Sequence, residues 1–270
     1  RSRKNQIIYS SKKVRNNNEV LNLIDNFLIE KNSFIFESVE KGKIKGRYTI
    51  FGRNPDKIWE FNNNNSYLIK NSKKIKLKDK PQILIENIIE DFKFKIPSGL
   101  PSISALISGY FSYDTIRYVE NIPNNCKDDL KVPDVRLLRP RTLIIHDNLK
   151  KKIFYIINIF KDEKIYNYSK KYLEIKSELA KLLNQSSTSK IDKINSKKLV
   201  RVNVKSNTSK KKFLNMVNKA KKYIKIGDIF QVVLSQRFET KLRKKPLEIY
   251  KKLRVTNPSP FMFFFNFNDF

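Results

Sequence analysis

The 270-residue sequence predicts an α+β fold built on an antiparallel sheet. Short apolar runs and period-2 alternation, which are typical of strands, dominate the first 160 residues. Few helical segments lie between these strands, and this favours antiparallel pairing over a doubly wound parallel sheet. The composition, 40% apolar and 12% aromatic, is that of a globular chain, and the length allows one large domain or two smaller ones.

The first elements combine a strand with amphipathic helices. Residues 5–11 predict a short strand. Residues 16–31 predict a helix in which Asn18 is the N-cap and the apolar side chains recur on one face. Residues 82–92 predict a second amphipathic helix from the same kind of spacing.

Strands fill the segment between these two helices. Residues 33–55 predict two strands that are joined by a turn at Gly42. The second strand is expected to end at Gly52 and Pro55, because glycine and proline punctuate strands. Residues 57–78 predict further short strands around a turn of consecutive asparagines.

The middle of the chain continues the same alternation. Residues 102–120 predict a buried strand at their start, in which Gly109 marks a bulge or the close approach of another backbone. Residues 141–160 predict a hairpin, since two apolar runs flank a polar turn. Residues 162–184 predict a long helix.

The last third begins with a linker and ends on an apolar strand. Residues 185–210 are polar and lack apolar periodicity, whereas residues 211–238 predict a helix, a stop at Gly227 and a half-buried strand. Residues 244–260 predict a helix that prolines end. Residues 261–268 alternate as a strand, and an unpaired apolar edge strand promotes aggregation. We therefore expect this strand to lie inside a larger sheet, and the chain not to end naturally here.

Cysteine and histidine are too scarce for several kinds of site. Cys126 is the single cysteine, which excludes an internal disulfide and indicates a reducing, cytoplasmic compartment. His146 is the single histidine, so the sequence predicts no zinc site of the His/Cys kind, whereas magnesium held by carboxylates is not excluded. We expect a structural role for His146 and none for Cys126. No glycine-rich nucleotide cradle is present.

The net charge of +31 invites a nucleic-acid interpretation. The excess is mostly lysine spread along the whole chain, together with frequent asparagine and isoleucine, which indicates a biased residue choice. We therefore predict a solvated basic surface and no nucleic-acid partner. No apolar run is long enough to cross a bilayer, so no membrane association is predicted.

Two stretches place polar or rigid groups at the ends of apolar strands. Glu37 and Ser38 follow an apolar run, and this indicates either a strand end in solvent or a pocket for an amine and a carboxylate. Pro260 stiffens the backbone just before Phe261 and Met262, and this indicates either a turn into a core strand or a rigid wall for a planar ligand.

Five blocks together resemble a known family over essentially the whole chain. In order and spacing they are SFIFESVEKGKIKGRYTIFG, SGYFSYDTIRYVE, PDVRLLRPRTLIIHDNLKKKI, YIKIGDIFQVVLSQRF and NPSPFMF. They resemble the large subunit, component I, of the anthranilate synthases, which are chorismate-utilising enzymes. The block GDIFQVVLSQRF is the most specific of them, whereas the short motif FES (36–38) alone would be weak evidence for the family.

The resemblance implies antiparallel sheets that are packed together and flanked by helices. It divides the chain into an N-terminal domain (1–185), a linker (186–207) and the start of a truncated chorismate-binding domain (208–270). The implied reaction is the first step of tryptophan biosynthesis: chorismate and ammonia give anthranilate and pyruvate with Mg²⁺. A glutamine amidotransferase subunit, component II, supplies the ammonia, and L-tryptophan inhibits the reaction.

The resemblance also implies a tryptophan-inhibitor site. Carried over motif by motif, its residues are Ser38, Pro260, Phe261 and Met262, with Glu37 and Arg47 as weaker candidates. The family usually has tyrosine at Phe261, so a phenolic hydrogen-bond donor is missing here. The catalytic residues and the magnesium ligands are expected beyond residue 270, so we expect this polypeptide alone to be inactive.

Three alternatives stay open. Component I of para-aminobenzoate synthase acts on the same substrate and differs in the product. A non-catalytic tryptophan-binding module and a basic nucleic-acid binder belong to other functional classes. Calorimetry with tryptophan tests the module, and steeply salt-dependent DNA binding would indicate the nucleic-acid binder.

Overall fold

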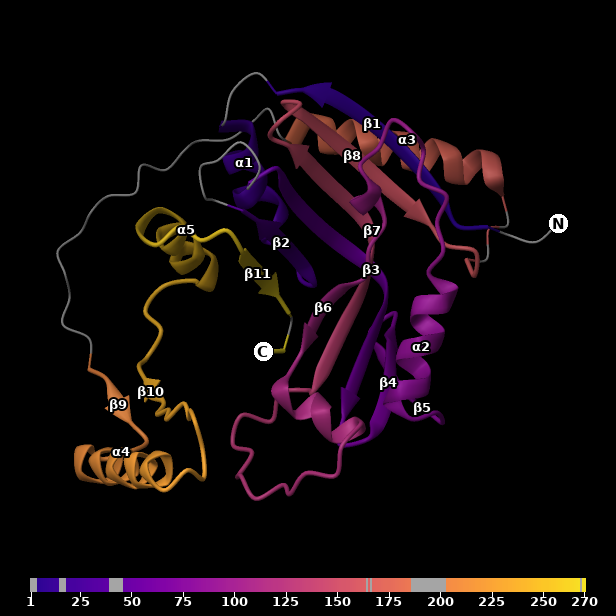
Figure 1. Cartoon of the computed structure of the whole chain (residues 1–270). Helices are drawn as coiled ribbons and strands as arrows, with labels where there is room; N and C mark the ends of the chain where they lie inside the picture. Colours follow the sequence, from indigo (N-terminus) through magenta and orange to yellow (C-terminus); the bar gives the residue numbers. More distant parts are fainter. Residues whose placement is uncertain are drawn as a thin grey trace. The chain divides into compact units, whose positions relative to one another are not determined.

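The computed structural model describes residues 4–14, 18–38, 46–163, 165, 167–185, 203–267 and 269–270. The chain divides into two compact units (Figure 1). The first comprises Arg1–Ile191 with Tyr250–Phe270, and the second comprises Asp192–Ile249. Most of the predicted linker, residues 186–202, lies outside the described residues. The family-based domain boundaries at 185 and 207 stay a prediction.

The first unit is built on a nine-stranded sheet whose strand pairs are all antiparallel. The main path is β1-β8-β7-β3-β2-β11, while β4 and β5 extend from β3, and β6 pairs with β7. The predicted α+β class with antiparallel pairing is confirmed. The strands are β1 (Gln6–Lys13), β2 (Ser33–Glu37), β3 (Tyr48–Asn62), β4 (Asn65–Lys70), β5 (Lys73–Leu77), β6 (Ser108–Phe111), β7 (Val135–Asp147), β8 (Lys152–Ile159) and β11 (Met262–Asn266).

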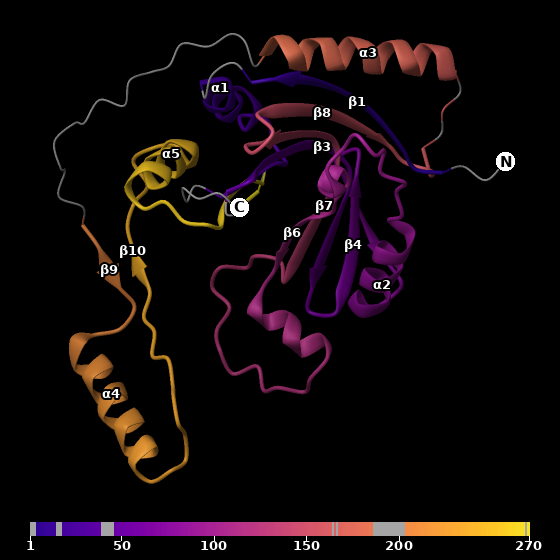
Figure 2. The ribbon, with the colours of Figure 1, turned by 45° about the horizontal axis from the view of Figure 1, so that its top comes forward.

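Two long strands, β3 and β7, run side by side along the length of this sheet (Figure 2). Their register shifts after Pro55, which lies opposite Pro140. A bulge tolerates proline because one residue there leaves the hydrogen-bond ladder, so the strand bends and continues. The prediction that the strand ends at Gly52 and Pro55 is therefore wrong.

Helices cover the outer faces of the sheet. Helix α3 packs along β8 and β1, and α2 lies beside β4 (Figure 2). Helix α1 packs against β3 through Phe27, whose ring meets Phe51 edge-on at 5.8 Å. The helices of this unit are α1 (Asn18–Phe27), α2 (Pro81–Asp91), α3 (Tyr168–Gln185), the short 3₁₀ helices η1 (Ser102–Ser104) and η2 (Tyr113–Tyr118), and the greater part of α5 (Pro246–Thr256), from Tyr250 on.

The segment from 102 to 120 differs from the buried strand that its apolar residues predict. It forms η1, the short strand β6 and η2. Gly109 does mark a close backbone approach, as predicted: a Cβ there would lie 1.9 Å from the carbonyl oxygen of Arg136. Strand β6 pairs with β7 over four residues, so this segment adds only a short ladder to one edge of β7.

One apolar cluster connects several strands of the sheet. Its buried members come from segments far apart in the sequence, most of them strands, and Phe265 of β11 packs against them. The buried members are Phe34, Ile58, Leu100, Leu138, Leu143, Ile145, Phe154 and Ile156. A second cluster lies under α2 and contains Trp59, Phe61, Ile88, Tyr118, Val135 and Leu137.

The second unit contains β9 (Lys205–Ser206), α4 (Lys210–Lys225), β10 (Phe238–Glu239) and the first turn of α5 (Pro246–Thr256). The Ser209 hydroxyl caps α4 by accepting from the backbone N–H of Lys212, and Gly227 ends it with φ of 84°. The predicted helix and glycine stop are confirmed. The predicted strand before residue 238 is wrong, because only β10 pairs there, with β9.

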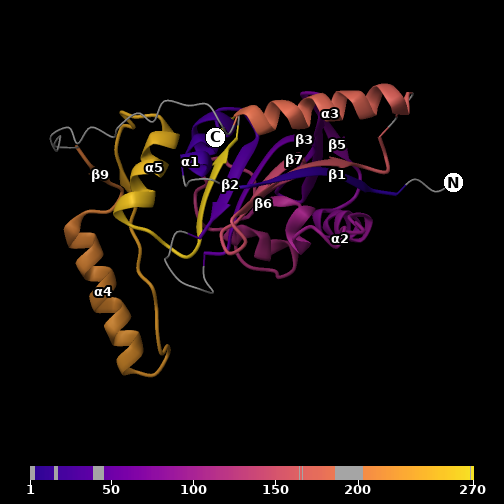
Figure 3. The same ribbon diagram turned by 90° about the horizontal axis from the view of Figure 1, so that it is seen from above.

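Strand β11 lies beside β2 at the end of the main path (Figure 3). Its register places Met262 opposite Glu37 and Phe265 opposite Phe34. Among the described residues β11 pairs with β2 alone. The expectation that further strands continue the sheet stays a prediction.

Candidate functional site

An apolar cavity of about 360 Å³ lies where β2 ends, β3 begins and β11 begins. All three strands belong to the first unit. The cavity is bordered by ten residues from these segments, most of them apolar or aromatic: Phe36, Glu37, Ser38, Gly46, Tyr48, Ile50, Pro260, Phe261, Met262 and Phe263.

Strand alternation decides which side chains face the cavity. Directly opposed residues of neighbouring strands share a face, and adjacent residues of one strand point to opposite faces. Phe36 is opposite both Ile50 and Phe263, so these three side chains form one row. Glu37 and Met262 form the next row, on the other face.

Five of the six sequence-predicted residues border this cavity. Ser38 and Glu37 come from the end of β2, and Pro260, Phe261 and Met262 come from the start of β11, more than two hundred residues later. Phe261 is 87% exposed, whereas Met262 is buried. The structure therefore brings these residues together, and their contact with a ligand stays a prediction.

The sequence analysis missed other bordering residues, notably Tyr48, Ile50 and Phe263. Their alternation with Thr49 and Phe264 is visible in the sequence, because both segments read as strands. What the sequence did not contain is the pairing of β2 with β3 and β11, which sets the residues side by side.

The carboxylate of Glu37 is directed to helix α5. Its carboxylate accepts hydrogen bonds from the Tyr250 hydroxyl at 2.5 Å and from Arg254 Nε at 2.8 Å, both on α5. The side chain of Glu37 is only 1% exposed. Burial and the neighbouring Glu37 carboxylate raise the pKa of the Tyr250 phenol, so this hydroxyl stays protonated and donates.

Arg47 is not among the residues that line the cavity. Its guanidinium donates to the carboxylate of Asp147 at 3.1 Å and lies 4.7 Å from the centroid of the Tyr48 ring. Burial opposes the charge on Asp147, but hydrogen bonds from Arg47 and two backbone N–H groups outweigh it and lower its pKa. Arg47 thus packs against the ring of Tyr48, which does line the cavity. A direct contact between Arg47 and a ligand stays a prediction.

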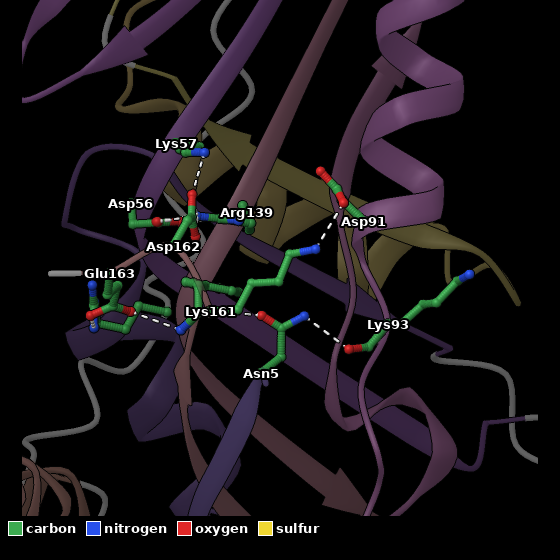
Figure 4. A network of polar contacts seen from close by, with 11 residues as sticks. Asn5, Asp56, Lys57, Asp91, Lys93, Arg139, Lys161, Asp162 and Glu163 are labelled. Carbon is green, nitrogen blue, oxygen red and sulfur yellow. Dashed lines mark hydrogen bonds and ion pairs between the residues drawn. The ribbon is translucent and has the colours of Figure 1, made fainter. Parts of the chain in front are cut away.

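A second, polar cleft of about 910 Å³ lies near the bend of β3 and β7. Asp56 and Asp162 are among the residues that line it. Arg139 donates to both of these carboxylates, and Lys57 pairs with Asp162 (Figure 4). The guanidinium of Arg139 also covers the Phe160 ring at 3.9 Å. Each of these carboxylates has a cation beside it, so this cluster connects the bend of β3 and β7 to the end of β8 through ion pairs.

Comparisons with known proteins show the family of this chain. A family model for chorismate binding enzymes matches residues 32–270. The chain belongs to this family. Anthranilate synthase component 1 of Acetivibrio thermocellus is 36% identical over 88% of this chain and 49% of its own length. The protein of the same name from Cereibacter sphaeroides is 31% identical over 98% of this chain and 54% of its own length.

Solved structures place the fold in the same family. Anthranilate synthase component I of Streptococcus pneumoniae has a TM-score of 0.67 and 28% identity, over 85% of this chain and 52% of that chain. The isochorismate synthase MenF of Escherichia coli, with a TM-score of 0.54 and 11% identity, supports the fold alone. This chain of the chorismate binding enzyme family spans about half the length of the relatives that it matches.

The family resemblance implies magnesium, and the described residues do not fit it. Within them, no group of three or more histidine, cysteine, aspartate or glutamate side chains lies close enough to hold a metal ion. No step of the reaction is therefore assigned to magnesium on these residues.

The single cysteine and the single histidine lie in different surroundings. Cys126 is exposed, and His146 is buried in β7, where burial lowers the pKa of its imidazole. No helix in the described part of the chain is long and apolar enough to span a membrane.

Proposed function

We propose that this chain is part of the large subunit of an anthranilate synthase. The reaction would be the conversion of chorismate and ammonia to anthranilate and pyruvate, the first step of tryptophan biosynthesis, in the cytoplasm. The supporting observation is that relatives named anthranilate synthase component 1 match 88% and 98% of this chain at 36% and 31% identity.

This chain's own part in that function is to form a regulatory site for L-tryptophan. Pockets for small ligands have volumes of about 300–1,000 Å³, and the cavity of about 360 Å³ lies at the small end of that range. Aromatic side chains at Phe36, Tyr48, Phe261 and Phe263 offer surfaces for an indole ring. We propose that the hydroxyl of Ser38, which borders the cavity, hydrogen-bonds the amino-acid end of the ligand.

The chemistry itself requires groups that we do not assign to this chain. Chorismate is a dicarboxylate, so its site needs fixed positive charges or donors, and magnesium would supply a Lewis acid when bound. We propose that a glutamine amidotransferase subunit, component II, delivers the ammonia. The 270-residue chain alone is therefore expected to show no turnover of chorismate.

Calorimetry with L-tryptophan tests the regulatory site. The chain is expected to bind L-tryptophan, and Ser38→Arg is expected to lower the affinity at least tenfold because a large cation fills the polar end of the cavity. Ser98→Arg is the matched control, since Ser98 lies in an exposed turn away from the cavity. Absence of binding by the unaltered chain, or unchanged binding by Ser38→Arg, would contradict the proposal.

A further inference from the structure

Among the residues that the structure describes, three side-chain contacts attach the end of α5 to the body of the first unit. The Tyr250 ring packs on Phe264 of β11 at 5.5 Å between centroids. Lys251 pairs with Asp25 of α1 at 2.6 Å, but both side chains are about a third exposed, and exposed pairs contribute little. The third contact is the buried cluster of Glu37, Tyr250 and Arg254, which we call the α5 clamp.

The α5 clamp is the strongest of these contacts by its burial and charge. The Arg254 side chain, 25% exposed, donates through Nε to both oxygens of Glu37 at 2.8 Å. Hydrogen bonds to a charged group are about twice as strong as neutral ones. Removing one partner of a buried charge pair is strongly destabilising, because the other charge is left without compensation. The position of α5 therefore depends on the position of Glu37.

Glu37 lies between two residues that line the cavity. Phe36 and Ser38 are its chain neighbours, and their side chains point to the cavity face, while Glu37 points to the α5 face. A ligand that orders Phe36 and Ser38 must also order the backbone that carries Glu37. The two faces of one strand end thus connect the cavity with the helix.

We propose that Glu37 is a positioning residue that couples occupancy of the cavity to helix α5 through Tyr250 and Arg254. This inference rests on the proposed regulatory site for L-tryptophan. The ligand binds the arrangement in which the strand end and the α5 clamp are formed, so it stabilises α5 without touching it. Because α5 starts in the second unit and ends in the first, the ligand acts on the segment that joins them.

Hydrogen exchange of the α5 amides, residues 250–257, measures this coupling with L-tryptophan as the probe. At a ligand concentration one hundred times its Kd, exchange by opening of the ligand-binding arrangement slows by about 100-fold. We expect slowing of this order, with a floor of tenfold, in the unaltered chain. For Tyr250→Phe and Arg254→Gln, calorimetry is expected to give a Kd within about threefold of the value for the unaltered chain. In both variants the ligand is expected to slow the exchange of the α5 amides by less than threefold.

Lys251→Gln is the matched control, because it removes an ion pair of the same helix that does not involve Glu37. This variant is expected to keep the full slowing of exchange. Binding of L-tryptophan with unchanged α5 exchange overturns the coupling alone, and so does full slowing in both clamp variants. Absence of L-tryptophan binding by the unaltered chain overturns the regulatory site and the coupling together. If one of the two clamp variants fails to fold, the other still tests the coupling.

Discussion

Gly52 and Phe34 form a pair in which the absence of a side chain on one strand makes room for a ring on the next. They are directly opposed in β3 and β2, and both are buried. A Cβ added at Gly52 would lie 2.2 Å from Cε1 and Cζ of the Phe34 ring, whereas ordinary contacts begin at 3.4 Å. We therefore expect Gly52→Ala to destabilise the fold through this ring.

The size of the effect follows from how little the ring can move. Phe34 is fully buried, and its ring packs against Phe36 at 5.2 Å and Phe265 at 5.6 Å between centroids. It would have to retreat by more than an ångström into these neighbours. Overpacking of this kind costs about 1–3 kcal/mol, and we expect the upper part of that range. For a unit of this size the melting temperature should fall by about 4–12 °C.

A double-mutant cycle measured by urea unfolding tests the assignment. Phe34→Leu alone should lose about 1–2 kcal/mol because it leaves a small cavity. The double variant Gly52→Ala with Phe34→Leu should be at least about 1 kcal/mol more stable than the sum of the single effects, because the shorter side chain admits the methyl group. Additive effects would refute the reasoning.

Gly99→Ala is the control for this cycle. It makes the same change in backbone freedom, but its Cβ would meet only the Tyr9 hydroxyl, at 3.1 Å, which is the tip of a partly exposed side chain. Its stability is expected to stay within about 0.5 kcal/mol of the unaltered chain. A loss as large as that of Gly52→Ala would point to backbone freedom rather than to the ring.

Two further predictions concern the bend and the edge of the sheet. Asp162 is partly buried, which opposes its charge, but Lys57 and Arg139 outweigh this and lower its pKa to about 2. A lowered pKa stabilises the fold above the ordinary value of 3.8, and this stability is lost as the pH falls towards 2. Asp162→Asn should therefore show a shallower fall of melting temperature between pH 4 and pH 2, and an unchanged slope would refute the pairing. Gly109→Ala should destabilise by about 2–3 kcal/mol in urea unfolding, because its Cβ meets backbone at 1.9 Å; a neutral result would show that β6 does not pair as described.

Local pattern was enough to predict the strands that build the candidate site. The apolar run before Glu37 and the alternating residues from Phe261 onward both form strands. Pattern was not enough at Pro55, because a proline ends an isolated strand but fits a bulge when a second strand lies opposite it. The difference is a property of the pair β3 and β7, and no window of one strand contains it.

The α5 clamp shows the same limit. Tyr250 and Arg254 are four residues apart on a predicted helix, so the sequence places them on one face. Glu37 lies 213 residues before Tyr250, and only the folded chain shows that this face meets the end of β2. The orientation of Glu37 could have been anticipated from alternation, since Phe36 and Glu37 are neighbours in β2 and point to opposite faces.

The ligand that we propose would act at the end of the β2–β11 ladder, where the cavity lies. Glu37 and Met262 form the last pair of this ladder, and Ser38 and Phe261 lie just beyond it. Strand ends open more readily than strand centres, so a ligand that spans the last pair orders a segment whose own stability is low. Phe261 and Phe263 are 87% and 65% exposed, and covering such apolar surface gains about 25 cal/mol per Å². Binding of the proposed ligand would therefore add stability at the point of the sheet where Glu37 connects to α5.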